Sequence, residues 1–434
     1  MIKPTKPRIS FYTLGCRLNQ AETASLQNSF EAHDYTVVDF EKPSDIVVIN
    51  TCTVTENGDA DTRRLVHKIN RVNPQAKIAL IGCQAQMQKE KLTRLPNVRW
   101  VVGNAKKMDL VSVLEEWADV GSPQVITPAF DREPFTVPVA GIDRQHTRAN
   151  LKIQDGCDFF CSFCEIPYAR GRARSREFEN ILLEANALVA AGHQEIVLTG
   201  INLGTYQHQN KNILKVIDAL EQIAGLERIR ISSIEPTTIP GELLTKMSAK
   251  SKLCRYLHVP VQSGHNDILE LMKRKYTIEE FADFIRAAHE AVPEICIGTD
   301  VIVGFPGETE RSFQQTYEQL KELPIDYFHV FTYSARTMAK SKDLPHTVPA
   351  SIIPQRSAAL RDLSQRKRRS YYHSLLGTIQ KVLFEQRDKH GYWDGVTDNY
   401  VRVKVQSEDP LTNRLVNVEL LELNGQAVIG QLRP

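Results

Sequence analysis

Residues 154–164 read Gln154-Asp155-Gly156-Cys157-Asp158-Phe159-Phe160-Cys161-Ser162-Phe163-Cys164. Its three cysteines have the spacing C-x3-C-x2-C, and no fourth cysteine follows nearby. Thiolates favour zinc, copper(I) or iron–sulfur clusters, and a structural zinc site uses four protein ligands. Three clustered thiolates therefore predict a four-iron cluster with one iron left open for a substrate. The alternative is three packed core cysteines, because free cysteine is among the most buried residue types.

The bulk properties are those of an ordinary globular protein. The 434 residues are 24% charged and 42% hydrophobic, and this length predicts two or three domains. The net charge is only +2, so any affinity for nucleic acid must come from local basic patches. The first seven residues lack the apolar run of a signal peptide, and no stretch approaches the roughly 18 apolar residues of a membrane helix. With reduced, metal-type cysteines, these features predict a cytoplasmic protein with no membrane attachment.

On the N-terminal side of the cysteine stretch, strand and helix patterns alternate. Apolar runs at residues 9–14, 45–50, 77–81 and 98–102 are separated by helical patterns at residues 22–33, 59–72 and 85–95. This alternation predicts an α/β domain with a parallel sheet, covering residues 1–125. Residues 126–145 are rich in proline and mixed charge and are interpreted as a linker.

The cysteine stretch lies near the start of a second alternating region, residues 146–370. Strands are predicted at residues 151–154, 195–199, 228–232, 256–261, 296–303 and 327–332. Six parallel strands with right-handed crossovers predict a partial (β/α)6 barrel with its site at the C-terminal mouth. The tail, residues 371–434, contains five short strand patterns separated by turn residues. It predicts a small OB-like β-barrel.

Three further cysteines each follow a predicted strand of the N-terminal domain: Cys16, Cys52 and Cys83. The carboxyl ends of parallel strands share one edge of the sheet, where ligands bind. The three thiolates would therefore meet without any short-range motif, and Gly15 and Gly82 would let the backbone approach a bulky group. We expect a second three-thiolate iron–sulfur cluster here. A zinc site and coincidentally placed core cysteines remain the alternatives.

These features resemble a known enzyme family. The C-x3-C-x2-C spacing with Phe163 before the last cysteine is similar to the radical S-adenosylmethionine (SAM) superfamily. Within this superfamily, the chain resembles the methylthiotransferases at residues 14–20, 50–52, 82–83, 166–171, 175–176, 198–202, 232–236, 258–264 and 300–309. The tail resembles the RNA-binding TRAM barrel that ends these enzymes. The resemblance implies an N-terminal methylthiotransferase domain, a radical SAM partial barrel and a C-terminal TRAM domain.

The resemblance also implies the cofactors, which are two [4Fe-4S] clusters and SAM. Cys157, Cys161 and Cys164 would hold the cluster that binds SAM and cleaves it to methionine and a 5′-deoxyadenosyl radical. The other triad would hold the auxiliary cluster that carries sulfur, a second SAM would supply the methyl group, and a flavodoxin- or ferredoxin-like protein would supply electrons. The implied cofactor-binding residues are Phe163, Thr199, Gly200, Asn202, Glu235, Gln262 and Ser263. Alternatively, the polar residues at these strand ends only cap helices or satisfy loop backbone.

Family members modify adenosines beside the tRNA anticodon or an aspartate of a ribosomal protein. Cationic clusters bind phosphates and aromatic rings stack on bases, although a charge run can also be a solvated face. The candidate RNA-binding residues are Arg170, Arg172, Arg174, Arg176, Arg368, Arg369, Trp393 and Tyr400. Residues 171–176, 272–277 and 391–400 resemble the branch that acts on N6-threonylcarbamoyladenosine.

The sequence thus predicts a tRNA methylthiotransferase that modifies C2 of this nucleoside at position 37, with the anticodon stem-loop as its partner. The alternatives are isopentenyladenosine in tRNA, the ribosomal-protein aspartate, or a non-catalytic iron–sulfur protein that binds RNA.

Two places depart from the family pattern. Glu165 stands directly after the third cysteine, where relatives usually have an apolar residue. Its carboxylate could alter the potential of the cluster or pair with a nearby arginine. Residues 334–339 lack the proline and glycine that relatives place after the last barrel strand, so a different shape is expected for that loop.

Overall fold

Short apolar strands build the N-terminal sheet, and those at its centre are buried on both faces. The computed structural model describes residues 6–53, 56–117, 121–139, 142–249 and 251–434. The strands are β1 (Arg8–Thr13), β2 (Thr36–Val38), β3 (Ile46–Thr51), β4 (Lys77–Gly82), β5 (Val98–Val102) and β6 (Gln124–Ile126). The helices are α1 (Arg17–Ala32), α2 (Glu56–Val72), α3 (Cys83–Met87), α4 (Lys89–Leu92), the 3-10 turn η1 (Lys107–Asp109) and α5 (Leu110–Glu116).

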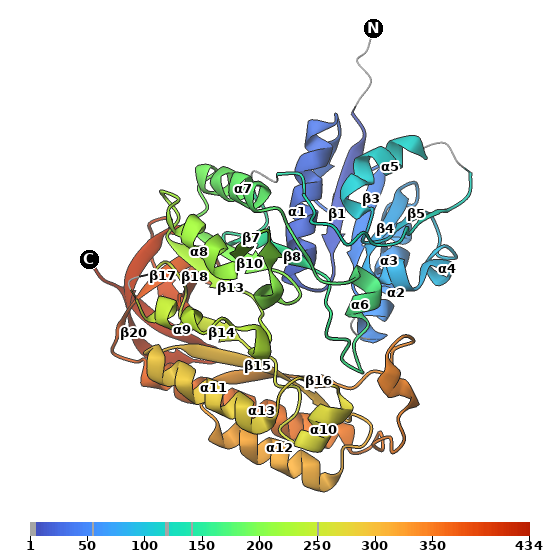
Figure 1. Ribbon diagram of the computed structural model, residues 1–434. Helices are drawn as coiled ribbons and strands as arrows, with labels where there is room; N and C mark the ends of the chain where they lie inside the picture. Colours follow the sequence, from blue (N-terminus) through green and yellow to red (C-terminus); the bar gives the residue numbers. More distant parts are fainter. Residues whose placement is uncertain (1–5, 54–55, 118–120, 140–141, 250) are drawn as a thin grey trace.

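Every pairing in this sheet is parallel, in the order β2-β1-β3-β4-β5-β6 (Figure 1). Alternate residues of β3 enter different cores: Val48 packs in the cluster that contains Phe30 of α1, and Val47 in the cluster that contains Val66 of α2. A parallel sheet whose strands are buried on both faces needs helices on both sides. The predicted α/β domain is therefore confirmed.

The central region is a partial barrel of six parallel strands. They are β7 (Ala149–Lys152), β10 (Glu195–Thr199), β13 (Arg228–Ile231), β14 (Tyr256–His258), β15 (Cys296–Val303) and β16 (Tyr327–Thr332). The first three pair with one another and so do the last three, and a bridge between Ile229 and Leu253 joins the two groups. The predicted partial barrel is therefore confirmed, with β7 and β16 as its edges.

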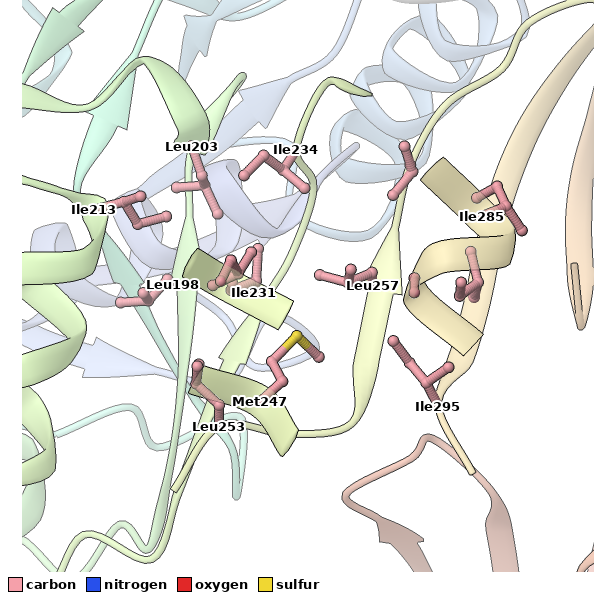
Figure 2. Packing of buried hydrophobic residues seen from close by; sticks show 14 of the residues in the cluster. Leu198, Leu203, Ile213, Ile231, Ile234, Met247, Leu253, Leu257, Ile285 and Ile295 are labelled. Atoms are coloured by element: carbon pink, nitrogen blue, oxygen red, sulfur yellow. The ribbon is translucent and has the colours of Figure 1, made fainter. Parts of the chain in front are cut away.

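Helices cover the outside of this barrel. They are α7 (Phe178–Ala190), α8 (Ile213–Glu221), α9 (Glu242–Ser248), α10 (Asn266–Leu271), α11 (Ile278–Ala291), α12 (Glu310–Glu322) and α13 (Ile353–Ser374). Shorter elements are β8 (Gln154–Asp155), α6 (Ile166–Arg170), β9 (Arg174–Ser175), η2 (Leu203–Thr205), β11 (Gln207–His208), β12 (Lys211–Asn212), η3 (Pro236–Thr238) and η4 (Lys340–Asp343). Figure 2 shows part of the core, where Leu198, Ile231 and Leu257 from three strands lie near Met247 of α9.

The tail forms a closed five-stranded barrel, as expected from its turn-punctuated strands. The strands β17 (Ile379–Arg387), β18 (Tyr392–Thr397), β19 (Arg402–Gln406), β20 (Leu415–Asn424) and β21 (Ala427–Leu432) close in the order β17-β18-β19-β21-β20. Its core continues into Tyr256, Cys296 and Tyr327 of the partial barrel. The predicted boundary at residue 370 lies inside α13. Across the described ranges, no helix combines the length and apolarity needed to cross a bilayer.

A buried ion cluster fixes the N-terminal sheet on the partial barrel. Glu22 of α1 accepts from Lys152 of β7 (2.7 Å) and Arg170 of α6 (3.1 Å), and it also pairs with Lys107. Asp155 accepts from the same lysine (2.7 Å) and the same arginine (3.0 Å). None of the five residues is more than 6% exposed. Because buried charges are tolerated only when they are paired, this cluster holds the two domains in one relative position.

Candidate metal centres and the cavity between them

The loop between β8 and α6 carries Cys157, Cys161 and Cys164 and is anchored along its length. Gly156 has φ +72°, and a Cβ there would lie 2.0 Å from the carbonyl oxygen of Arg172, so only glycine fits this turn. The backbone N–H of Cys157 donates to Gly171 (3.1 Å), while that of Ser162 donates to Met272 (3.0 Å). The local sequence therefore brings three half-buried thiols together on one short, fixed loop.

Two N–H groups point at the sulfurs of this loop. Arg274 Nη1 donates to Cys161 Sγ (3.2 Å), and the backbone N–H of Ile166 donates to Cys164 Sγ (3.4 Å). Burial raises the pKa of Cys157 to about 11 and also raises the pKa of the other two thiols. Metal binding must therefore displace protons from these groups. Hydrogen bonds to sulfur are one means by which a protein tunes a cluster.

Arg274 is a site residue that sequence reasoning missed. It lies in the basic run of residues 272–277, whose sequence indicates only a resemblance to one branch of the family. Its guanidinium also pairs with Glu235, and the structure leaves Arg274 only 9% exposed. The contact with Cys161 spans 113 positions in the sequence, so no local pattern could reveal it.

Cys16, Cys52 and Cys83 lie at the carboxyl ends of β1, β3 and β4, which are neighbours in the sheet. Gly15 has φ +92°, and a Cβ there would lie 2.9 Å from Cys52 Sγ. The end of β1 thus touches the end of β3. Asn104 Nδ2 donates to Cys83 Sγ (3.4 Å) and to the carbonyl of Ala169 in α6 (2.7 Å). Folding of the sheet therefore brings the second triad to one edge, beside the helix that follows the first triad.

The type of the donors fits a cluster at each triad. Each triad supplies three thiolates, which are soft ligands that suit iron–sulfur clusters, whereas a structural zinc site takes four protein ligands. Among the other described residues, His258, Asp300 and His329 bring three ligand atoms within 4.8 Å of one another.

Arg170 lies between the two triads and corrects one expectation. Its side chain is 0% exposed, and its Nη2 donates to Asn19 Oδ1 (2.5 Å). Burial acts to lower the pKa of Arg170, but the nearby Cys83, acidic groups and Cys16 hold it well above the ordinary value. Arg176 is also 0% exposed and pairs with Glu184. A phosphate cannot reach a guanidinium with no exposed surface, so neither arginine belongs in the RNA-binding set.

The two tail aromatics predicted to bind RNA, Trp393 and Tyr400, also pack against other parts of the protein. Trp393 is 7% exposed, and its Nε1 donates to the carbonyl of Ser407 (3.1 Å). Tyr400 stacks on Tyr256 of the partial barrel at 4.4 Å between ring centroids and accepts from Arg17 (3.5 Å). Both rings are used in packing, which corrects the expectation that they stack on RNA bases.

Three of the predicted RNA-binding arginines keep accessible surface. Arg172 is an exposed residue that lies over the ring of Phe160 (4.4 Å), and Arg369 is exposed on α13. Arg368 is half-buried and lies over the ring of Tyr327 (4.6 Å). The fourth, Arg174, has a side chain that is only 11% exposed and lies 3.8 Å from Asp155 of the buried ion cluster.

The strand-end residues predicted to bind cofactors are found in two settings. Gln154 Oε1 accepts the backbone N–H groups of Ile201 (2.8 Å) and Asn202 (3.0 Å) and lies 2.9 Å from the place of a Cβ on Gly200. Asn202 Oδ1 in turn accepts from Thr238 Oγ1 (2.8 Å). Hydrogen bonds from side chains therefore hold the loop after β10 in place. This loop starts beside the buried Thr199.

The other predicted residues differ in what they reach. Glu235 is paired with Arg274, and its pKa is raised by burial, which outweighs the opposing effect of that arginine. Gln262 and Phe163 line a cavity. The hydroxyl of Ser263 instead interacts with Thr316 Oγ1 (3.3 Å) and is buried. The cofactor-binding role predicted for Ser263 stays a prediction, and the contact that the structure shows is with α12.

The cavity has a volume of about 190 Å³ and is lined from both domains. Cys164 of the first triad contributes to its wall, and so does Thr53, which directly follows Cys52. The further lining residues are Phe163, Glu165, Ile166, Gln262, Asp300, Ile302, Phe331, Thr332, Tyr333, Ser334 and Arg336. Phe331 is 41% exposed, so an aromatic surface is open at this cavity.

Comparison with known proteins agrees with this geometry. The chain matches the radical SAM superfamily over residues 151–320 and the uncharacterized protein family UPF0004 over residues 8–103. It is 37% identical over 425 residues to the threonylcarbamoyladenosine tRNA methylthiotransferase MtaB of Bacillus subtilis. The aligned part covers 95% of this chain and 94% of that relative. It is 31% identical over 429 residues to the tRNA-2-methylthio-N(6)-dimethylallyladenosine synthase of Thermodesulfovibrio yellowstonii, with 97% of each chain covered.

A solved structure shares the fold. The radical SAM methyltransferase TsrM of Kitasatospora setae matches with a TM-score of 0.55 and 16% identity, over 75% of this chain and 73% of that one. At this identity the likeness concerns the fold alone.

Proposed function

The chain belongs to the radical SAM methylthiotransferase family, and from this premise we propose that it inserts a methylthio group at C2 of N6-threonylcarbamoyladenosine at position 37 of tRNA, next to the anticodon. The choice of nucleoside is supported by the relatives. The relative named for the threonylcarbamoyl nucleoside is 37% identical, and the relative named for the dimethylallyl nucleoside is 31% identical. Both names concern tRNA, so tRNA is the common substrate class.

The observation that carries this proposal is the cavity shared by the two domains. Its wall contains Cys164 of the first triad and Thr53, which directly follows Cys52 of the second, so one partly open cavity lies beside both triads. Two centres held on either side of this cavity would both act on one carbon only if the target base lay between them. Such positioning supplies a large part of the rate of a bimolecular step.

Membership of the family brings a [4Fe-4S] cluster and SAM, and the residues of the first triad fit that cluster by donor type and spacing. We further propose that Cys16, Cys52 and Cys83 hold a second cluster and that a second SAM provides the methyl group. When bound, these groups supply the radical and the sulfur, which are chemistry that side chains cannot provide. An electron donor of the flavodoxin or ferredoxin type completes the proposal.

The protein's own residues hold the loops around the cavity in place. Gln154 fixes the loop after β10, and Arg274 neutralises Glu235 while it donates to Cys161. The buried ion cluster around Glu22 closes the space between the domains. These contacts keep the cavity walls in place, because buried pairs are held in one geometry by the surrounding protein.

The same proposal assigns the RNA surface. Arg172, Arg368 and Arg369 retain accessible surface, and such cationic groups bind the phosphates of an anticodon stem-loop without sequence preference. Phe331 offers an exposed ring at the cavity on which the target base can stack.

Mass spectrometry of tRNA digests from a strain that lacks this gene tests the proposal. The strain should lose 2-methylthio-N6-threonylcarbamoyladenosine and accumulate N6-threonylcarbamoyladenosine, which lacks the methylthio group. The purified, anaerobically reconstituted enzyme should restore the methylthio group to this tRNA. An unchanged level of this nucleoside in the deletion strain would overturn the proposal. Loss of the dimethylallyl derivative instead would move the protein to the other branch.

A further inference from the structure

The two departures from the family pattern meet each other. Arg336, in the loop after β16, donates from Nε to Glu165 Oε2 (3.2 Å), and the backbone N–H of Met338 donates to Oε1 (2.9 Å). Both oxygens of the unexpected carboxylate are therefore held by the loop that lacks the family's proline and glycine. Of the two outcomes expected for Glu165, the structure shows pairing with an arginine.

The same arginine reaches the N-terminal domain. Its Nη2 donates to Thr53 Oγ1 (2.8 Å) and to Asp59 Oδ2 of α2 (2.9 Å). Figure 1 shows the loop after β16 passing close to α6 and α2, as these contacts require. Thr53 directly follows Cys52, just as Glu165 directly follows Cys164. One guanidinium thus connects the residues next to a cysteine of each triad.

The ion pairs of Arg336 are buried, and they lie at the wall of the cavity. The side chains of Arg336, Asp59 and Glu165 are 6%, 9% and 4% exposed, so salt screens them far less than it screens surface pairs. The planar fork of arginine can hold partners on two sides at fixed angles, whereas an ammonium group cannot. Unlike the closed cluster around Glu22, however, Arg336 and Glu165 both line the cavity.

The position of the bridge suggests its role. We propose that Arg336 is a positioning residue that sets the separation of the two cysteine triads across the cavity, so that a radical formed at one side is used for sulfur insertion at the other. This inference rests on the proposed function, since that function gives the second triad its cluster. A misplacement of about 1 Å between reacting groups can cost on the order of a hundredfold in rate, which makes the separation a sensitive quantity.

The first measurement is the coupling of the two half-reactions. The full-length enzyme is reconstituted anaerobically as wild type, Arg336→Gln, Arg336→Lys and the matched control Arg64→Gln. Arg64 lies on α2, as Asp59 does, but its side chain is 79% exposed and pairs with the surface Asp61. Arg336→Gln should still make 5′-deoxyadenosine, while methylthiolated RNA formed per 5′-deoxyadenosine falls roughly a hundredfold. Arg336→Lys should fall less, and Arg64→Gln should match the wild type.

The second measurement does not depend on activity. Pulsed EPR on the reduced enzyme reports the distance between the two clusters, and iron content and the thermal midpoint verify loading and folding. Arg336→Gln should shift or broaden the distance distribution, and Arg64→Gln should leave it unchanged. If Arg336→Gln does not load, Asp59→Asn takes its place, because it removes the ion pair that joins Arg336 to the N-terminal domain and keeps the shape of the side chain.

The outcomes separate the two proposals. A wild-type coupling ratio together with a wild-type distance distribution in the variant would overturn the positioning role. A wild-type enzyme that cleaves SAM but never modifies the threonylcarbamoyl nucleoside would overturn the proposed function. The EPR distances would still decide the role of Arg336 in that case.

Discussion

The two cysteine triads reach similar donor sets by opposite routes. Cys157, Cys161 and Cys164 share one loop whose backbone is fixed by Gly156 and by contacts to the ends of α6 and α10. Cys16, Cys52 and Cys83 come from three strand ends and meet only when the sheet has formed. The first triad is a local structure, and the second is a product of the whole N-terminal domain. Changes to the loop should therefore act on one triad, whereas changes to domain docking should act on the second first.

The largest effect is expected from removal of the second triad. Replacing Cys16, Cys52 and Cys83 together by alanine should leave the cleavage of SAM to 5′-deoxyadenosine but abolish methylthiolation of tRNA, because the sulfur-carrying site is lost while the radical-forming loop is untouched. Both products are measured by mass spectrometry, and iron content should fall by about half if both triads hold equal clusters. Retained methylthiolation in the triple variant would contradict the role of the auxiliary site.

The sequence predicted the first triad more completely than its surroundings. The spacing of three cysteines is visible in eleven residues, and the second triad follows from a rule about strand ends. By contrast, Glu22 meets Arg170 across 148 positions, so the sequence showed an accessible basic run where the fold has a buried ion cluster. Burial of Arg170 is decided by a partner that no local pattern identifies.

The same reasoning explains the differences in the fold. The six barrel strands and the five tail strands lie in apolar runs that can be predicted; even β14, with three residues, opens the longer run 256–261. By contrast, β2 and β6 have three residues each with no longer apolar run around them. The helix predicted at residues 85–95 is interrupted at Gln88, whose φ of −128° and ψ of 35° are not helical. Long-range contacts thus decide side-chain roles, and short elements escape periodicity.

A second prediction concerns the buried ion cluster that docks the two domains. Glu22→Gln leaves Lys107, Lys152 and Arg170 with Asp155 as the remaining carboxylate of the cluster, so we expect a loss of about 3–5 kcal/mol in the free energy of unfolding. Chemical denaturation measures this loss, and the second triad should lose iron before the first. Asp283→Asn is the matched control, since its side chain is 81% exposed in a surface pair with Arg286; it should cost less than about 1 kcal/mol. Equal losses in the two variants would show that the cluster does not hold the domains.

A third, smaller effect is expected from pH. Burial acts to raise the pKa of Glu22, but Arg170 and the two lysines outweigh it and hold this pKa well below its ordinary value; the pKa of Asp155 is lowered as well. Groups with a lowered pKa in the folded state stabilise it above their unfolded pKa, near about 4 for both acids. This stability is lost as the pH falls through and below that value. In protein prepared without iron–sulfur clusters, the thermal midpoint should therefore drop steeply below about pH 4.5. Glu22→Gln should make this drop less steep. A parallel pH dependence in that variant would assign the acid lability to other groups.

The smallest expected effects separate the two triads directly, through the single side chains that donate to their sulfurs. Asn104→Ala removes the bond to Cys83 Sγ and the bond to the carbonyl of Ala169, and each such bond contributes about 1 kcal/mol to stability. Arg274→Gln removes a positive charge beside Cys161, which should make the reduction potential of that cluster more negative because its reduced form loses an electrostatic partner. Redox titration followed by EPR should show Asn104→Ala changing only the auxiliary signal and Arg274→Gln only the SAM-binding one. If either variant moved both signals equally, the two triads would not be the independent local and tertiary sites that their construction from one loop and from three strand ends implies.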